Sequence, residues 1–376
     1  MQADKKIERL IHVLGLAVQQ KVSDVQLLPG HPPIMKFSDT STEYGGTDLT
    51  GEDIRNFTDY ILATSYEDVD TIKNKSFSYE LEDIGRFRVS PFTSRSKLCL
   101  SIRVIPVEVR SFEDLNLPEQ IATIAQLQRG LVLVTGATGQ GKSTTISAIL
   151  QQINRTREGI IITLEDPIEF TYKKQKSIII QRELGEDTPN LAEALDETLR
   201  HSPDVIMIGE IRDKETFEGV LTLAETGHLV ISSIHTSDAK TTILRILDFY
   251  NEPERKSVLN RLANSLKMVV SQRLARTAPD QIAERVPVCE VLAINSAVAD
   301  SIRNPDKLDS IKEYMERGND YYGMQTFDQH LIKLVNKGTI DLDTALAYAN
   351  SPTEVERAYT LSGKGLDKVD KLNEID

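Results

Sequence analysis

A glycine-rich segment near the middle of the chain combines the residue types that bind nucleotide phosphates. Its members are Gly136, Ala137, Thr138, Gly139, Gln140, Gly141, Lys142, Ser143 and Thr144. Glycines let backbone N–H groups turn toward the phosphates, the lysine reaches the β and γ phosphates, and the serine hydroxyl is a ligand for Mg²⁺. Apolar residues 131–135 precede this phosphate loop and a helical pattern follows it, as such a loop requires. The segment therefore predicts an ATPase that binds ATP with Mg²⁺.

Acidic residues follow two other apolar segments and are candidates for the same site. Residues 205–208 lead to Glu210, and residues 160–164 lead to the acidic segment 165–169. The carboxyl ends of parallel strands meet at one edge of a sheet, where ligands of α/β proteins bind. Glu210 is therefore a candidate metal ligand together with Ser143, and one carboxylate of residues 165–169 is a candidate to orient water. A solvated acidic turn is the alternative for residues 165–169.

Histidines and arginines add further candidates for phosphate binding. His228 and His235 flank the apolar residues 229–234, and their spacing is not that of metal ligands. Neutral imidazoles are able to donate hydrogen bonds near the γ phosphate, with a structural role as the alternative. Arginines alternate with apolar residues in the N-terminal part of the chain at Arg86, Arg88, Arg95 and Arg103. Guanidinium groups stabilise charge on a transferring phosphoryl group, with a solvated strand face as the alternative.

The first part of the chain has the pattern of a small α+β domain. A helical stripe of apolar residues covers residues 7–18, and β-prone segments follow at residues 23–27, 85–91 and 98–105. We expect a small domain over residues 1–107 and a polar linker, followed by proline, over residues 108–117.

Residues 118–376 alternate between strand and helix patterns. Apolar segments at residues 131–135, 160–164, 205–208 and 229–234 predict an α/β domain with a parallel sheet covered on both faces. We expect Thr188 to cap a helix whose buried face contains Leu191, Ala194, Leu195 and Leu199. The tail from Pro253 onward is predicted to be mostly amphipathic helix and to fray after Ser362.

Composition narrows the classes of partner. Lys and Arg total 44 against 57 Asp and Glu, a net charge of −13, so the surface repels phosphate backbones and nucleic acid is not an expected partner. Cys99 and Cys289 lack a nearby second cysteine and are expected to be buried thiols in a reducing cytosol. The apolar residues 10–18 are too short to span a bilayer, which favours a soluble, unexported protein.

Together these motifs resemble one family, the secretion-superfamily ATPases, and within it the PilT-like retraction ATPases of type IV pili. The motifs that carry the resemblance are Ser23-Asp24, Gly85-Arg86-Phe87-Arg88-Val89, the phosphate loop, residues 165–169, Glu210-Ile211-Arg212-Asp213, His228 with His235, Ser271-Gln272-Arg273-Leu274 and Gly323-Met324-Gln325-Thr326-Phe327-Asp328-Gln329.

The resemblance implies a hexameric ring in which each subunit joins a PAS-like small domain to a RecA-like ATPase domain with a helical C-terminal region. By position it implies catalytic roles for Glu169, Glu210, Arg88, Arg103, His228 and His235. Glu169 matches the catalytic glutamate and Glu210 the metal-associated acid. The expected partner is an inner-membrane pilus platform protein, approached from the cytoplasm, with a paralogous retraction ATPase as a second partner. Whether the chain is a principal or an accessory motor stays open.

Three positions depart from the family pattern. Gln26 replaces the usual histidine, Arg95 stands one position before the expected arginine, and Gln140 occupies a place where a small residue is usual. The chain lacks the paired CxxC motifs and the longer N-terminal region of extension ATPases, which favours retraction over pilus assembly or secretion. A DNA-handling RecA-like motor and a nucleotide-binding ring subunit with little turnover are further alternatives.

Overall fold

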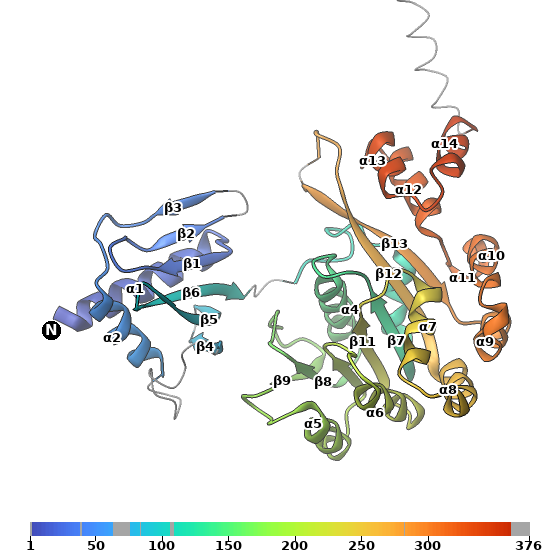
Figure 1. The fold of residues 1–376 in the computed structure, drawn as a ribbon, viewed down its shortest axis with the longest axis horizontal. Helices are drawn as coiled ribbons and strands as arrows, with labels where there is room; N and C mark the ends of the chain where they lie inside the picture. Colours follow the sequence, from blue (N-terminus) through green and yellow to red (C-terminus); the bar gives the residue numbers. More distant parts are fainter. Residues whose placement is uncertain are drawn as a thin grey trace, which may run out of the picture. The chain divides into compact units, whose positions relative to one another are not determined.

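The computed structural model divides the chain into two compact units (Figure 1). It describes residues 2–37, 40–62, 76–82, 84–105, 109–281 and 283–361. Unit 1 comprises Met1–Glu108 with Glu169–Lys173, and unit 2 comprises Val109–Ile168 with Lys174–Asp376. The predicted fraying after Ser362 falls outside the described residues.

Unit 1 contains a six-stranded antiparallel sheet in the order β3-β2-β1-β6-β5-β4 and two helices. The elements are α1 (Gln2–Gln19), β1 (Asp24–Leu27), β2 (Ile34–Lys36), β3 (Ser41–Glu43), α2 (Gly51–Leu62), β4 (Phe77–Leu81), β5 (Gly85–Ser94) and β6 (Lys97–Ile105). Apolar residues recur at helical spacing in both helices, and Leu14, Phe57 and Phe87 pack into one buried cluster. This architecture confirms the predicted small α+β fold.

Unit 2 is built on a seven-stranded sheet in the order β13-β12-β7-β11-β10-β8-β9. The strands are β7 (Gly130–Thr135), β8 (Gly159–Glu165), β9 (Ser177–Glu183), β10 (Val205–Ile208), β11 (Leu229–Ile234), β12 (Leu266–Arg276) and β13 (Arg285–Ala293). All neighbouring strands are parallel except β12 and β13, which form an antiparallel pair. The predicted parallel sheet is therefore present, with one antiparallel strand at its edge.

Helices connect and cover these strands. They are α3 (Glu119–Ala122), α4 (Lys142–Thr156), α5 (Leu191–Thr198), α6 (Lys214–Glu225), α7 (Ala239–Asp248), α8 (Glu252–Ser265), α9 (Ser296–Arg303), α10 (Ser310–Arg317), α11 (Asn319–Tyr322), α12 (Phe327–Asn336), α13 (Leu342–Tyr348) and α14 (Pro352–Leu361). Among the described residues, none of the helices has the length and apolar character needed to cross a membrane.

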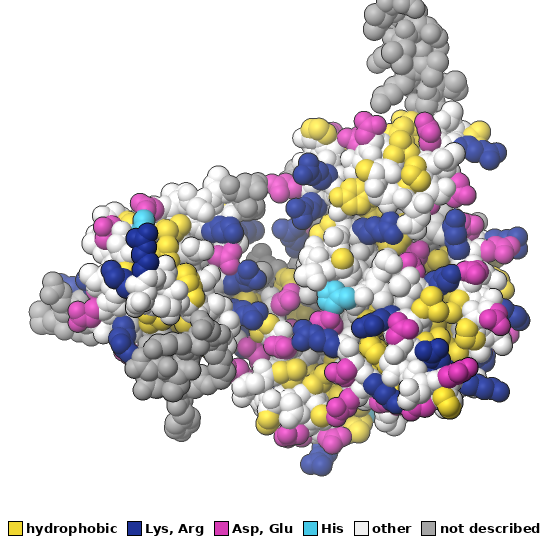
Figure 2. Space-filling view, viewed as in Figure 1, with side chains coloured by type: hydrophobic (Ala, Val, Ile, Leu, Met, Phe, Trp, Pro, Cys, Tyr) yellow, Lys and Arg dark blue, Asp and Glu magenta, His cyan; other side chains and the backbone are white. Residues whose placement is uncertain are grey.

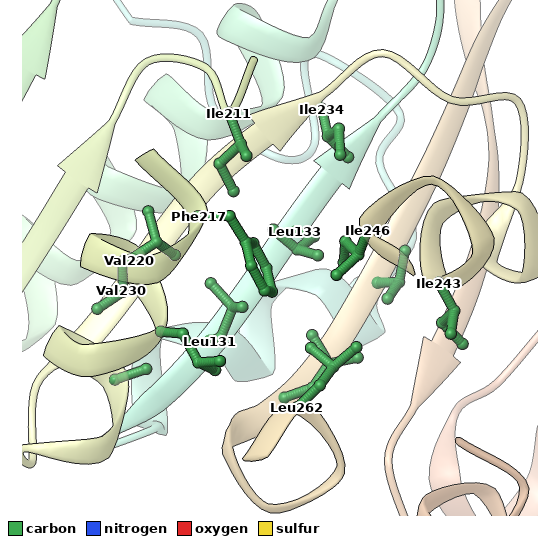
Figure 3. Packing of buried hydrophobic residues seen from close by; sticks show 14 of the residues in the cluster. Leu131, Leu133, Ile211, Phe217, Val220, Val230, Ile234, Ile243, Ile246 and Leu262 are labelled. Carbon is green, nitrogen blue, oxygen red and sulfur yellow. The ribbon is translucent and has the colours of Figure 1, made fainter. Parts of the chain in front are cut away.

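The centre of unit 2 is a large apolar cluster on one face of the sheet. Phe217 of α6 lies against Leu131 and Leu133 of β7, and Ile246 of α7 and Leu262 of α8 complete the packing (Figure 3). Successive strand residues point to opposite faces, so the equally buried Val132 and Val134 lie on the other face of β7. A strand buried on both faces gives the phosphate loop that follows it a rigid base.

The prediction for the start of α5 is wrong. Asn190, not Thr188, caps the helix, and its Oδ1 accepts a hydrogen bond of 3.0 Å from the backbone N–H of Glu193. Asn is among the best N-cap residues because its short side chain reaches this unpaired donor. The helix also ends earlier than expected, and the side chain of Leu199 is 45% exposed.

The helical prediction for the tail is wrong over residues 266–293. This segment contains β12 and β13, which pair with each other, and β12 also pairs with β7 in the middle of the sheet. A strand buried on both faces has no polar alternation, so its apolar run resembles a buried helix. The remaining tail is helical from α9 to α14, as predicted.

Candidate active site

The phosphate loop begins where β7 ends and closes on the first residue of α4. Gly141, the residue before α4, has φ 82°, a left-handed conformation that favours glycine. A Cβ atom at Gly136 would lie 2.6 Å from the backbone oxygen of Gln272 on β12, closer than carbon and oxygen approach. Glycine is therefore required at position 141 by the backbone conformation and at position 136 by the lack of space for a side chain.

Lys142 points back into the loop. Its Nζ donates to the backbone oxygens of Gly136 at 2.9 Å and Ala137 at 3.1 Å, and lies 3.3 Å from Nδ1 of His235. An ammonium group only donates hydrogen bonds, so Nδ1 accepts and the ring proton of a neutral His235 is on Nε2. The lysine and the histidine after β11 are thus brought together by contacts that fix the tautomer of the imidazole.

Glu210 continues this array of contacts. Its Oε1 lies 3.0 Å from Nε2 of His235, and its Oε2 accepts a hydrogen bond of 3.1 Å from Nε of Arg212. Nη1 of Arg212 lies 3.8 Å from Oδ2 of Asp166. The four strands that precede these groups, β7, β11, β10 and β8, are neighbours in the sheet. The carboxyl edge of the sheet therefore collects two cations, an imidazole and two carboxylates. The roles of Lys142, His235 and Glu210 at the nucleotide stay predictions.

The members of the acidic segment 165–169 have different environments. Glu165 is 7% exposed, and its Oε1 accepts hydrogen bonds from Thr163 Oγ1 at 2.7 Å and Gln181 Nε2 at 3.1 Å. Asp166 and Glu169 are exposed, and Glu169 begins the segment Glu169–Lys173 of unit 1. The buried carboxylate is already bonded by β8 and β9, and the role of Glu169 stays a prediction.

Two of the predicted arginines are neighbours within unit 1. Arg88 of β5 lies directly opposite Arg103 of β6, and Nε of Arg103 donates to Oδ1 of Asp24 at 3.1 Å. Arg103 is 65% exposed. Arg95 lies in the turn between these strands with φ 50°, not within a strand as its spacing suggested. The catalytic roles of Arg88 and Arg103 stay predictions.

The two histidines of the predicted pair are separated by a full strand. His228 precedes β11, and its Nδ1 lies 3.1 Å from the backbone oxygen of Leu223 at the end of α6. His235 follows β11. A six-residue strand is about 20 Å long at the usual rise per residue. Within one chain, only His235 lies at the phosphate loop, and a role of His228 at the nucleotide stays a prediction.

Three residues next to the loop were not predicted as site residues. Thr145, Gln272 and Leu274 bond to each other or to the loop, across more than a hundred positions of sequence. The only sequence signal was the motif of residues 271–274, which the family resemblance includes without a chemical role.

The sheet, the phosphate loop and the acid after β10 define a RecA-like P-loop ATPase. The family model described as type II/IV secretion system protein matches residues 73–345, so the chain belongs to this family of secretion ATPases.

Individual relatives resemble the chain over nearly its whole length. The type IV pilus ATPase PilU of Pseudomonas aeruginosa is 38% identical over 94% of this chain and 91% of its own. The type IV pilus retraction ATPase PilT of the same organism is 35% identical over 91% of this chain and 98% of its own. A crystal structure of the pilus retraction motor PilT with bound ADP superposes with a TM-score of 0.82 at 36% identity, covering 92% of this chain and 98% of that one. These similarities confirm the predicted family, fold class and ATPase activity.

Proposed function

We propose that the chain is the subunit of a homo-hexameric motor that uses ATP hydrolysis to retract type IV pili and so to drive twitching motility. The observation that carries the proposal is the array of Lys142, His235 and Glu210 at the phosphate loop. It occurs in a chain similar over its length to PilT and PilU. A pilus-assembly or secretion ATPase is the second candidate, since the same family includes secretion proteins.

ATP would bind with its phosphates against residues 136–144. The ammonium of Lys142 now donates to two loop oxygens, and phosphate oxygens would take their place. Ser143 and Glu210 offer the hydroxyl and carboxylate oxygens that Mg²⁺ prefers, and the ion would neutralise phosphate charge.

The remaining predicted residues would complete the reaction. Glu169 would accept a proton from the attacking water, while Arg88 and Arg103 would stabilise charge on the transferring phosphoryl group. His235 would respond to the γ phosphate, because it contacts both Lys142 and Glu210.

The organisation predicted from the sequence forms part of the proposal. Residues 1–107 would form the PAS-like domain, residues 108–117 the linker and residues 118–376 the ATPase domain. The ring would work in the cytoplasm on an inner-membrane platform protein, with a paralogous retraction ATPase as a further partner. Both acidic and basic side chains occur on the surface shown in Figure 2, and the net charge of −13 supports protein partners rather than nucleic acid.

Two measurements test the proposal. The purified chain should release phosphate from ATP in the presence of Mg²⁺ and have the native mass of a hexamer. Deletion of the gene should leave surface pili that no longer retract, because assembly would continue without disassembly. Loss of the pili themselves would instead support the assembly motor, and a chain that binds ATP without turnover would contradict both motor functions.

A further inference from the structure

We propose that Gln140 and Gln272 are positioning residues that clamp the phosphate loop to β12, and that this clamp couples nucleotide binding to the C-terminal helices. The inference rests on the proposed binding of ATP at this loop. Gln140 belongs to the predicted phosphate loop and Gln272 to a motif of the resemblance, and the contact between them was not predicted from the sequence.

The first contact replaces a missing strand partner. Strands β7 and β12 pair in parallel up to Thr135 opposite Ser271, and beyond that point β7 turns away into the loop. The side chain of Gln140 fills the place next to β12, because its Oε1 accepts a hydrogen bond of 2.6 Å from the backbone N–H of Leu274. A backbone donor near the sheet interior is thus paired by the loop itself.

The second and third contacts come from Gln272. Its Nε2 donates to the backbone oxygen of Gln140 at 2.7 Å, and its Oε1 accepts from Thr145 Oγ1 at 2.6 Å. Gln272 and Thr145 are 2% and 1% exposed. One amide group therefore bonds the loop with one end and α4 with the other, and burial keeps water from replacing either bond.

The loop and the strand also fit closely. A Cβ atom at Gly141 would lie 2.8 Å from Nε2 of Gln272, so the glycine before Lys142 is in contact with the clamp. Movement of the loop toward or away from a phosphate would change these bonds.

The same strand contacts the C-terminal helices through its next residue. Side chains alternate along a strand, so Arg273 points away from the loop. Its Nη1 donates to the backbone oxygen of Tyr348 at 2.8 Å and its Nη2 to Oδ1 of Asn350 at 2.8 Å. Its guanidinium group lies 3.9 Å from the centre of the Phe327 ring. Strand β12 thus connects the phosphate loop to α12, to the end of α13 and to the residues before α14.

The test uses the full-length hexamer and the substitution Gln140→Met, which keeps the length of the side chain but removes the acceptor. The affinity for ATP should fall on the order of tenfold, and by a larger factor than kcat falls, because the loop loses its preset conformation. Hydrogen exchange at Leu274 should accelerate, and the protection that nucleotide gives to residues 348–351 should shrink.

Controls separate the clamp from general effects. Gln128→Met alters an exposed glutamine whose amide donates to the backbone oxygen of Gln126, and it should leave the affinity, kcat and hydrogen exchange unchanged. Gln140→Ser provides a second variant in case the methionine disturbs folding. Arg273→Lys should reduce the affinity for ATP less than Gln140→Met does. It should nevertheless lose the protection from hydrogen exchange that nucleotide gives to residues 348–351.

Two negative outcomes have different meanings. If the wild-type chain binds no ATP, the proposed function itself fails. If the wild type binds and hydrolyses ATP while both position 140 variants keep its affinity and its exchange at Leu274, the clamp is overturned.

Discussion

The ammonium group of Lys142 is held in place by the protein itself, because its acceptors are loop oxygens and an imidazole nitrogen. Nε2 of His235 in turn bonds to Glu210. Lys142, His235 and Glu210 therefore form a chain of contacts that holds the imidazole in one tautomer. When phosphate oxygens replace the loop oxygens, the lysine must shift and the bond to His235 must adjust. We therefore expect a change at the γ phosphate to affect His235 at the end of β11.

Lys142→Ala should abolish ATP turnover. The substitution removes the ammonium of the phosphate loop, and charge that develops on the phosphate is no longer compensated. Phosphate release measures the effect, and Lys307→Ala, which alters an exposed lysine of unit 2, is the matched control. Turnover near that of the wild type would refute the assignment of the loop.

Glu169→Gln should leave ATP binding largely intact and reduce turnover on the order of a hundredfold, the size of a lost acid–base group. The amide keeps the shape of the side chain but does not act as a base. Equilibrium binding and phosphate release, measured side by side, check the result. A parallel loss of both would make Glu169 a structural or metal-holding residue and would transfer the catalytic assignment to Glu165.

At the scale of residues, the sequence predicted which side chains lie near the phosphate loop better than it predicted the hydrogen bonds between them. The phosphate loop is a local pattern, and Glu210 and His235 each follow a recognisable strand. The bond between Gln140 and Leu274 joins positions 134 apart, and no periodicity in the sequence predicts such a pair. His228 was predicted to lie near the nucleotide, but the length of β11 separates it from the loop.

Among the secondary-structure elements, β13 carries a buried carboxyl group next to the start of α7. Glu290 is 4% exposed, and its Oε1 accepts a hydrogen bond of 2.9 Å from the backbone N–H of Ala239. The pKa of Glu290 is raised from 4.5 to about 7, mainly by burial, while the hydrogen bond from Ala239 and the charge of Arg273 oppose the shift and the charge of Asp238 adds to it. The folded chain therefore holds a proton that the unfolded chain releases.

Glu290→Gln should stabilise the protein at high pH but not at low pH. A raised carboxyl pKa means that wild-type stability falls as pH rises from about 4.5 to about 7, after which the penalty is complete. Each pKa unit corresponds to about 1.4 kcal/mol, so the variant should gain about 3 kcal/mol in free energy of unfolding at about pH 8. It should gain little at about pH 5.

Denaturant unfolding of both proteins across this range checks the prediction. The difference between them isolates Glu290, because other titrating groups such as the buried His330 contribute equally to both curves. An equal difference at both ends of the pH range would show that the effect comes from packing and not from ionisation.

Elements with a clear pattern were predicted from the sequence, and those determined by tertiary pairing were not. Strands β7, β8, β10 and β11 agree with their apolar segments to within one residue or two. The helical prediction for β12 fails because residues on both faces of this strand are buried, which removes the polar alternation of a half-buried strand. Valines at 269 and 270, together with those at 286, 288 and 291, were the available β-propensity signal.

For the whole molecule, we predict that arginines of unit 1 act on a nucleotide bound in unit 2. Arg88→Ala and Arg103→Ala should each retain ATP binding and lose most turnover, since a transition-state guanidinium can contribute roughly a thousandfold in rate. Binding and phosphate release by each purified variant check this expectation. Full activity of both variants would remove these arginines from the mechanism.

Mixing an arginine variant with Lys142→Ala tests action between subunits. If the arginine acts on a neighbouring subunit, mixed rings contain some interfaces with an intact loop and an intact arginine, and turnover partly returns. Native mass confirms that mixed rings form. Mixed rings with no more activity than either variant alone would contradict action across the interface.

The position of β12 beside β7 has a consequence for synthesis on the ribosome. More than a hundred residues separate the two strands in sequence, so β7 leaves the ribosome long before its partner. Until β12 arrives, one edge of β7 is open and the glycine-rich turn after it lacks its support, a situation that favours chaperone binding or aggregation. A nascent chain should therefore acquire the ability to bind ATP only late, after residue 276 has emerged.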